Sequence, residues 1–466
     1  MTPEQWRDRL LGKLDSRQGD VTKYRAYYDG NHPLPEGPKK ETEKFRRLQK
    51  AARANWMGLI VDAVAERMHI VGFRFGDNQA ADADAWEIWQ ANQLDADHKL
   101  VDLDALTLGS SYALVWPDPE HSARVRITAE HPSQCVVAYE PGDRRKRAAG
   151  LKRWVEQDGT YCTLYLPGLV YKWYAPAGAP VHAKAAPAVE NGVTLTTTGS
   201  VRWEERVVPG ESWPLEISLD RVPLIELRPR PKWDGCGRSE LDGLTDIQDR
   251  TNHTTFNQMV AAEYSAFRQK WATGLDIPED EEGNPVEPFE AAVNRLWASE
   301  NPDTKFGEFS QTDLTNYVKA READINTLAA VSRTPPQYLL GAMVNVSGDA
   351  LKAAESGLTS KVRDRQTYLG EDWEEVLRTA FAARGDSDRA AEVSAEVIWK
   401  DPEIRSEGEL VDALVKMRTL GVPVAELWRR WGATPQEIER WKIESVEDAL
   451  NAALAVQPAG LPTDGV

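Results

Sequence analysis

The sequence predicts an α+β protein, and two observations carry that prediction. Short strand patterns rich in Val, Tyr and Trp recur between residues 110 and 174, with turn residues between them. Apolar residues at helical spacing precede and follow this region. At 466 residues the chain is long enough for two to four domains with cores of their own. We therefore expect an antiparallel sheet region flanked by helices.

The chain is predicted to begin with helices. Apolar spacing indicates a first helix through Trp6, Leu10 and Leu14, and residues 29–33, Asp-Gly-Asn-His-Pro, form a turn. Asn55 is suited to cap the next helix. The apolar residues of that helix are Leu59, Ile60, Ala63, Val64 and Met68. A strand at 71–75 and a helix around 83–90 follow.

Six strands are expected in the middle of the first half. They cover residues 111–116, 123–128, 135–139, 151–155, 161–165 and 170–174. Residues 175–199, rich in Ala, Pro, Thr and Gly, are expected to form a mobile surface loop.

Two polar, rod-like helices are predicted after residue 238. Ser239 is the expected cap of the first, which is about 27 residues long and so roughly 40 Å. Its apolar residues form one narrow stripe, Leu241, Leu244, Ile247, Phe256, Met259 and Val260. The second, 312–331, carries Leu314, Tyr317, Val318, Ile325 and Leu328. Narrow stripes suit side-by-side packing of helices better than a globular core.

An acidic insert, 275–303, separates the two rods. It holds four prolines and the run Glu279, Asp280, Glu281 and Glu282. A solvated loop and a docking surface are both open interpretations. Residues 306–309 are a possible strand that pairs with 268–273.

After the second rod, Pro335 and Pro336 open an apolar loop that extends to Val346. A buried connection and a loop facing a lumen or a partner are equally compatible with its residues. A third helix follows, with Ser347 as its cap, and Gly357 and Gly370 are expected weak points or kinks. Shorter helices are predicted at 406–420, 424–431 and 435–441, and the tail from 457 is expected to be disordered.

Several function classes receive little support from the sequence. It contains no Walker loop, no GxGxxG after a strand, no GxSxG and no HExxH, so we expect no enzyme, cofactor or metal site. The net charge of −18 argues against tight, general binding of nucleic acid. The three cysteines are expected to be reduced, and no signal peptide or membrane-spanning helix is expected. The segment 419–441 resembles a helix-turn-helix, but its acidic surroundings disfavour DNA readout. The alternative function is a soluble carbohydrate-active enzyme that uses some of the 17 tryptophans, and the sequence leaves a glycosidase carboxylate pair open.

The order of segments resembles the portal protein of long, non-contractile-tailed bacteriophages, the head-to-tail connector. The resemblance spans about residues 24–444 and is carried by the stretches 54–64 (ANWMGLIVDAV), 235–241 (GCGRSEL), 246–250 (DIQDR), 256–260 (FNQMV), 332–336 (SRTPP) and 348–355 (GDALKAAE). None of these stretches has a catalytic meaning.

The resemblance implies a portal fold with named parts. Residues 1–237 would be the α+β wing, 238–266 the first stem helix, 267–310 the clip and 311–331 the second stem helix. Residues 332–347 would be the tunnel loop, 348–384 the long wing helix, 385–455 the helical crown and 456–466 a disordered tail.

The resemblance also implies a role. The family forms a ring, usually of twelve subunits, at one capsid vertex, and double-stranded DNA is packaged and ejected through its channel. Implied partners are the major capsid protein, scaffold, terminase large subunit and head-completion or adaptor protein, with assembly in the host cytoplasm and no membrane. Twelve chains would carry roughly −200 charges, a field that keeps sliding DNA from adhering.

Candidate site residues follow from that assignment. The tunnel loop would offer Gln337, Tyr338, Leu339, Leu340, Met343, Val344 and Asn345 to the DNA. The candidate channel cations are Lys319, Arg321, Lys352 and Lys361, and the candidates for clip docking are Glu279, Asp280, Glu281 and Glu282.

Overall fold

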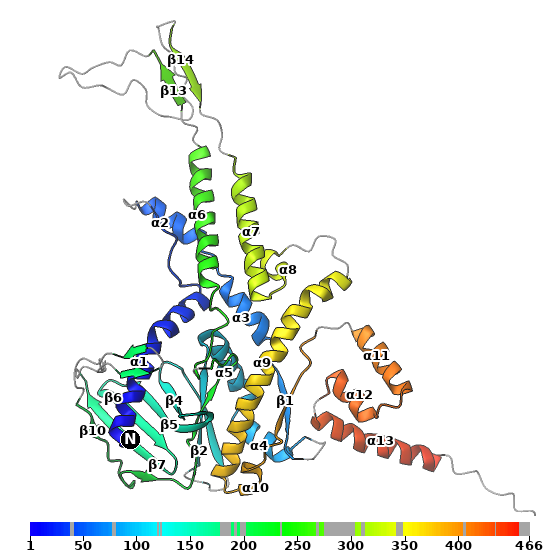
Figure 1. The fold of residues 1–466 in the computed structure, drawn as a ribbon. Coiled ribbons are helices and arrows are strands. Elements are labelled where there is room, and N and C mark those ends of the chain that lie inside the picture. Colours follow the sequence, from blue (N-terminus) through cyan, green and yellow to red (C-terminus); the bar gives the residue numbers. More distant parts are fainter. Residues whose placement is uncertain are drawn as a thin grey trace, which may run out of the picture. The chain divides into compact units, whose positions relative to one another are not determined.

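The computed structural model divides the chain into two compact units. Unit 1 comprises Met1–Tyr28, Gly58–Asp242 and Asn345–Val466, and unit 2 comprises Asp29–Met57 and Gly243–Val344 (Figure 1). The structure describes all residues except 38–41, 77–80, 119–120, 122–123, 178–187, 191–192, 196–201, 234, 267–269, 275–302, 309–312, 342–347, 404–406, 434 and 456–466.

Unit 1 contains two antiparallel sheets that confirm the six predicted strands. The larger sheet has the order β10-β7-β6-β5-β4, with β11 also paired to β7, and the smaller has the order β12-β2-β3. Their bounds are β2 Ser111–Pro117, β3 Val125–Glu130, β4 Cys135–Glu140, β5 Asp143–Val155, β6 Gly159–Leu166, β7 Leu169–Pro176, β10 Glu204–Glu205, β11 Leu215–Glu216 and β12 Leu224–Leu227. Neighbouring strands follow one another along the chain from β4 to β7, because short turns join antiparallel strands.

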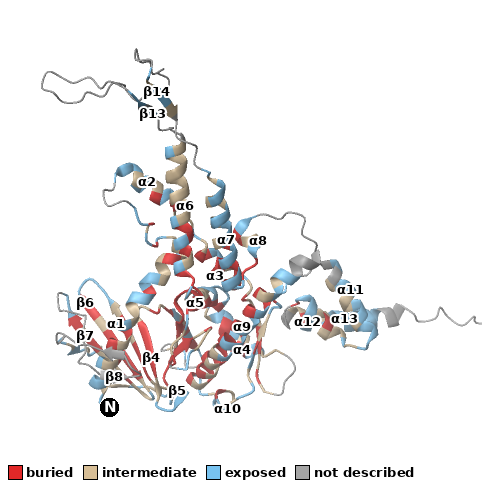
Figure 2. Cartoon of the chain, turned by 45° about the horizontal axis from the view of Figure 1, so that its top comes forward, coloured by how far each residue is buried: buried red, intermediate tan, exposed pale blue. Residues whose placement is uncertain are grey.

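Both faces of the larger sheet are buried, because successive side chains of a strand point to opposite faces. On one face, Val136 packs with Leu10 and Leu14 of helix α1, Pro3–Tyr28. On the other face, Val137 packs with Leu224 of the smaller sheet. The buried residues therefore run through the middle of the strands (Figure 2).

A buried carboxylate links α1 to both sheets. Glu226 of β12 accepts hydrogen bonds from the hydroxyls of Tyr112, at 2.9 Å, and Tyr139, at 3.1 Å. Arg17 of α1 lies 3.6 Å from the same carboxylate. Burial would raise the pKa of Glu226, but Arg228 and Arg17 outweigh burial and lower it.

The other helices of this part of unit 1 enclose a second core. Their bounds are α3 Met57–Ala65, which begins at the unit border, α4 Ala83–Ala91, α5 Leu94–Leu108, α9 Gly348–Ala383 and α10 Ser387–Ala390. Trp89 of α4 and Trp373 of α9 are fully buried and meet edge to face, with ring centroids 5.1 Å apart. These two tryptophans serve the packing of the core, to which large aromatic side chains contribute much buried area.

The Asn55 cap is confirmed, since the Asn55 Oδ1 atom accepts a hydrogen bond from the Met57 N–H at 3.1 Å. Strand β1, Ile70–Arg74, pairs with β15, Glu396–Trp399, a strand that we did not predict. Helix α9 runs continuously through Gly357 and Gly370, so neither of these expected weak points interrupts the helix. At Gly370 a Cβ atom would lie 3.3 Å from the Trp399 indole nitrogen, so this glycine lets β15 approach α9 closely.

Unit 2 holds the two predicted rods. Its elements are α2 Glu43–Ala52, α6 Thr245–Ala266, β13 Lys270–Thr273, β14 Lys305–Glu308, α7 Thr315–Ser332 and α8 Pro336–Leu340. The predicted pairing across the insert is confirmed, because β13 and β14 are antiparallel neighbours. The first rod begins six residues later than predicted. Gly243 has a φ of +82°, a conformation that a right-handed helix cannot include.

Three helices end the described chain: α11 Glu407–Thr419, α12 Val424–Trp431 and α13 Pro435–Ala455. The first two match the prediction, and α13 continues well past residue 441. Trp441 of α13 contacts Trp428 and Trp431 of α12, with ring centroids 5.6 and 5.9 Å apart. The predicted disordered tail lies outside the described residues. The predicted loop at 175–199 lies largely outside them, and within it β8, Ala188–Glu190, pairs with β9, Val193–Leu195.

Two glycines of unit 1 bring main chain against main chain. Gly109 ends α5 with a φ of +90°. A Cβ atom on Gly237 would lie 1.7 Å from the Gly109 carbonyl oxygen, well inside the shortest contact that real atoms make. Only glycine fits at this crossing.

The first prediction concerns Asp102, a fully buried carboxyl of α5. Its Oδ1 accepts a hydrogen bond from the Trp373 indole at 3.0 Å, and burial raises its pKa from 3.8 to about 7. When the pKa of a carboxyl is higher in the folded than in the unfolded state, the free energy of unfolding falls as the pH rises from about 4 to 7. Asp102→Asn should therefore raise the Tm at pH 8, by the equivalent of ~2–4 kcal/mol, and change it little at pH 4.

Thermal unfolding followed by circular dichroism at both pH values measures this effect. Asp97→Asn removes the same charge from a less buried position of α5 and is the control. An equal change for Asp102→Asn at pH 4 and pH 8 would contradict the prediction.

Candidate channel helices and docking surfaces

Helices α6 and α7 of unit 2 pack side by side (Figure 1). Polar contacts join them. The Arg250 Nε atom lies 2.8 Å from the Asp324 Oδ1 atom, and the Thr254 hydroxyl donates to Asp324 Oδ2 at 3.4 Å. Asp324 is largely shielded from solvent whereas Arg250 is exposed, so the pair fixes the helix register more than it stabilises the unit.

The buried face of α6 is partly polar, which the predicted apolar stripe did not indicate. Gln248 and Asn252 are buried one helical turn apart. Gln248 accepts a hydrogen bond from the Trp56 N–H at 3.1 Å and donates to the Ala54 carbonyl at 3.0 Å. Asn252 accepts from the Ala54 N–H at 3.1 Å, and its amide lies 2.8 Å from the His32 Nε2 atom.

These bonds tie an irregular strand of main chain to α6. Amide side chains suit this role, because each can donate and accept at once. Ala54 and Trp56 of the stretch 54–64 and Gln248 of the stretch 246–250 take part in this network. The sequence signal was two amides at i and i+4 beside apolar residues, a pattern that alone does not distinguish a buried face from a solvated one.

We call residues 257–265 of α6 and 315–324 of α7 the outer halves of the rods. In the single chain none of their residues is fully buried. No residue from 257 to 265 of α6 is buried, although this segment contains Met259, Val260 and Tyr264. On α7 no residue from 315 to 324 is buried, and burial begins at Ile325. Apolar side chains on a helix normally find a covering surface, so these halves are incomplete as they stand in the single chain.

The β13–β14 hairpin, between the two helices in sequence, exposes aromatic side chains. Trp271 faces Gly307 across the strands, and a Cβ atom on Gly307 would lie 2.3 Å from the indole ring. The glycine thus lets the indole lie flat across the neighbouring strand, and Phe306 next to it is also exposed. The docking candidates Glu279, Asp280, Glu281 and Glu282 lie outside the described residues.

The segment after α7 turns sharply into the short helix α8. Arg333 adopts a left-handed conformation with a φ of +56° and ends α7. Pro336 then occupies the first turn of α8, where the lack of an N–H costs nothing.

The first part of the predicted tunnel loop is therefore helical. Within it, the Leu339 side chain is 8% exposed and its carbonyl accepts a hydrogen bond from the Trp56 indole at 3.3 Å. Leu340 is 38% exposed, whereas Gln337 and Tyr338 are half-buried. Leu339 therefore anchors this segment, and its expected exposure toward DNA is corrected. Met343, Val344 and Asn345 lie outside the described residues.

The four candidate channel cations have different surroundings. Lys319 is exposed on α7, and Arg321 of the same helix is half-buried. The side chain of Lys352 lies outside the described residues. Lys361 of α9 is only 4% exposed and lies 2.8 Å from Glu240, so its assignment to the channel surface is corrected.

Glu240 is the centre of a buried ionic cluster in unit 1. Besides Lys361, it contacts Arg365 at 2.6 Å and Arg230 at 3.9 Å. Burial would raise the pKa of Glu240, but Lys361 and Arg365 outweigh burial and lower it to about 2. Burial lowers the pKa of Lys361, and Glu240 offsets only part of that effect. The cations therefore set the direction for Glu240, whereas burial sets it for Lys361.

Among the described residues, no group of three or more His, Cys, Asp or Glu side chains is placed to hold a metal ion. No helix in the described ranges combines the length and apolar character needed to cross a membrane.

The arrangement defines a structural assembly protein: paired rods with incomplete outer halves, an exposed hairpin and a loop that is anchored at one residue. Residues 8–449 match the family model described as phage portal protein, SPP1 Gp6-like. The chain belongs to this family of phage portal proteins and has its structural role.

Individual relatives agree with this assignment. The portal protein of Mycobacterium phage D29 is 26% identical over 95% of this chain and 89% of its own length. That of Mycobacterium phage L5 is 27% identical over 88% of this chain and 81% of its own length. The chain was also matched to a solved structure, the virion of a native gene transfer agent particle. The match covers 89% of this chain and 95% of the chain in that structure, at 13% identity and a TM-score of 0.39. The family and the two mycobacteriophage relatives give no support to the carbohydrate-active alternative.

The second prediction concerns the Glu240 cluster. Glu240→Gln leaves Lys361 and Arg365 buried without a counter-charge, so we expect a loss of ~3–5 kcal/mol of folding stability. Replacing Lys361 by Met in the same chain should recover part of this loss, since it removes one of the uncompensated charges. Urea unfolding monitored by tryptophan fluorescence measures both variants.

The matched control is Asp242→Asn, which removes a carboxylate paired with the exposed Arg238. We expect a loss of less than about 1 kcal/mol there. Equal losses of folding stability for the Glu240 and Asp242 variants would show that the buried cluster stabilises the fold no more than an exposed ion pair does.

Proposed function

We propose that this chain assembles into a closed ring, of twelve copies in the virion, around a channel for double-stranded DNA. One observation carries the proposal: the outer halves of α6 and α7 contain apolar side chains but no buried residue. Neighbouring copies would supply the missing cover, as identical subunits do in cyclic assemblies. Family membership implies a capsid-associated oligomeric ring.

The DNA would pass without sequence readout. The net charge of −18 per chain disfavours adhesion of the phosphate backbone, while Lys319 and Arg321 of α7 are the described cations that could form local rings. Lys352 stays a candidate for the same role. The chain's part would be mechanical, with nucleotide hydrolysis belonging to a separate motor.

The tunnel loop would contact the moving DNA through the residues around α8. Leu340 is its exposed apolar side chain among the described residues, and Gln337 and Tyr338 are half-buried beside it. Met343, Val344 and Asn345 complete the proposed lumen-facing set. Leu339 would hold the loop to Trp56 and so keep it in place.

The hairpin and the acidic insert would form the clip. The exposed Trp271 and Phe306 favour a protein partner there, since aromatic residues are enriched at interfaces. Proposed partners are the terminase large subunit, with Glu279–Glu282 in its docking surface, and later the head-completion or adaptor protein. The major capsid protein and scaffold would contact the wing, with assembly in the host cytoplasm.

The third prediction tests ring assembly. The purified chain should elute as one species at a multiple of 52.1 kDa in size-exclusion chromatography with light scattering, and negative-stain images should show a central hole. Tyr264→Asp, at the exposed aromatic position on the outer half of α6, should abolish assembly and leave the Tm of the monomer unchanged.

Leu100→Asp, at an exposed position of α5, serves as the control and should leave the ring intact. A wild-type chain that stays at 52.1 kDa from low to high salt would rule out the proposal.

The fourth prediction separates two adjacent leucines. Leu339→Ala should lower folding stability by ~2–4 kcal/mol, because it empties a buried site. Leu340→Asp should change stability by less than about 0.5 kcal/mol and keep ring assembly, yet reduce the yield of packaged DNA. Chemical unfolding measures the stability of both variants, and the amount of nuclease-protected DNA in a packaging assay measures packaging. Normal packaging by Leu340→Asp would contradict the proposed contact between this loop and the DNA.

A further inference from the structure

The second half of α13 is a helix without cover from its own chain. No residue from 442 to 451 is buried. Ile443, Val446 and Leu450 are 61%, 68% and 60% exposed, and their spacing places them on one face. A short isolated helix is marginally stable in water, so an exposed apolar stripe indicates a packing partner.

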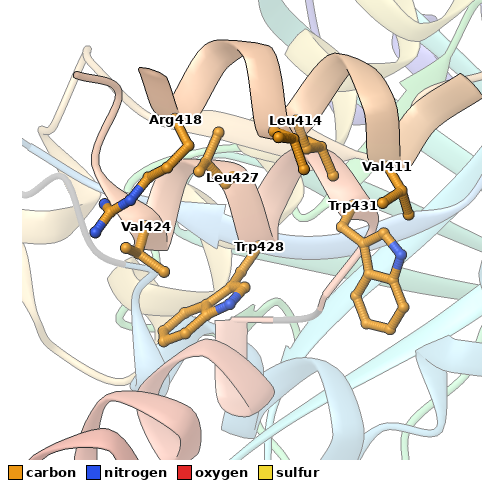
Figure 3. Close-up of a pocket in the computed structure, with 8 residues that line it drawn as sticks. Val411, Leu414, Arg418, Val424, Leu427, Trp428 and Trp431 are labelled. Carbon is orange, nitrogen blue, oxygen red and sulfur yellow. The ribbon is translucent and has the colours of Figure 1, made fainter. Parts of the chain in front are cut away.

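A groove between α11 and α12 offers an apolar surface of matching kind. It has a volume of about 320 Å³, and Figure 3 shows its side chains projecting from the two helices. The lining residues that matter here are Leu414, Val415, Arg418, Leu427, Trp428 and Trp431. Val415 and Trp431 are exposed, so the groove is open at its edge.

The apolar stripe of α13 points away from its own α12. Trp441 of α13 is the residue that packs against Trp428 and Trp431. At 100° per residue, Ile443, Val446 and Leu450 lie roughly 140–200° around the helix from Trp441. One face of α13 therefore contacts its own chain, and the opposite face is left for another molecule.

Charge favours the groove as the partner of that stripe. The stripe segment 443–450 has three acidic residues, Glu444, Glu447 and Asp448, and no basic one. The segment 411–431, which holds the groove's lining residues, has four cations against two carboxylates. Arg418 lines the groove, and among the described residues it has no ion-pair partner.

We propose that the Ile443–Leu450 stripe of one copy occupies the α11–α12 groove of the next copy. This inference rests on the proposed ring. Every chain carries one stripe and one groove, so the contact is head-to-tail, the geometry that generates rings. The acidic flank of the stripe then lies beside Arg418 of the neighbour.

The fifth prediction tests the contact by cross-linking of the full chain. Val415→Cys and Val446→Cys are combined in a Cys236→Ser background, in which the remaining Cys135 and Cys162 are buried. Mild oxidation should give a ladder of dimers, trimers and larger species on non-reducing gels. Each single variant should stay a monomer band. Leu420→Cys with Val446→Cys is the control, because Leu420 is exposed but does not line the groove.

A charge reversal checks the same contact independently. Arg418→Glu should reduce the ladder severalfold, and Glu447→Arg in the same chain should restore it.

Three outcomes would overturn the proposal. A ring seen by light scattering without a ladder means that the stripe lies elsewhere. A fast-migrating, internally cross-linked monomer means that a chain fills its own groove. A ladder that appears only after deletion of residues 456–466 means that this segment occupies the groove. If no ring forms in the wild-type chain, the proposed function fails first and this contact fails with it.

Discussion

The buried charge of Glu240 is the interaction on which the layout of unit 1 depends. It joins two segments that are far apart in the sequence: one with Arg230 and Glu240 itself, and one with Lys361 and Arg365 on α9. Its main-chain N–H also donates to Leu106 at the end of α5. A carboxylate surrounded by three cations tolerates little displacement, because any movement leaves a charge buried without compensation. The main chain therefore leaves unit 1 toward α6 from a fixed point.

The burial of side chains changes along α6 and α7, and the proposed ring assembly rests on this change. The half of α6 with Gln248 and Asn252 is held by hydrogen bonds to Ala54 and Trp56. The other half carries apolar residues, and none of its residues from 257 to 265 is fully buried in the single chain. A helix pair built in this way has one end that is complete in the monomer and one end that the proposed assembly would complete. The same division recurs in α13, whose first half packs on α12 and whose second half does not.

Much of the fold could be predicted from the sequence, because strand alternation and helical spacing are local signals. The six strands, the rods, the Asn55 cap and the β13–β14 pairing were found in this way. Strand β15 was missed because its partner β1 is more than 300 residues away. The site was harder to predict. The burial of Lys361 depends on Glu240, and the anchoring of Leu339 depends on Trp56, and both contacts join segments that periodicity cannot relate.

The crossing of Gly109 and Gly237 has a mechanical consequence. Most contacts in a protein interior join side chains, which can change rotamer and yield by fractions of an ångström. Here two stretches of main chain touch directly, and neither has a side chain that could give way. The two segments of main chain therefore cannot move closer to each other. A load that presses the segment before Ser239 toward the end of α5 would meet main chain directly, with no side chain between the two segments to absorb it.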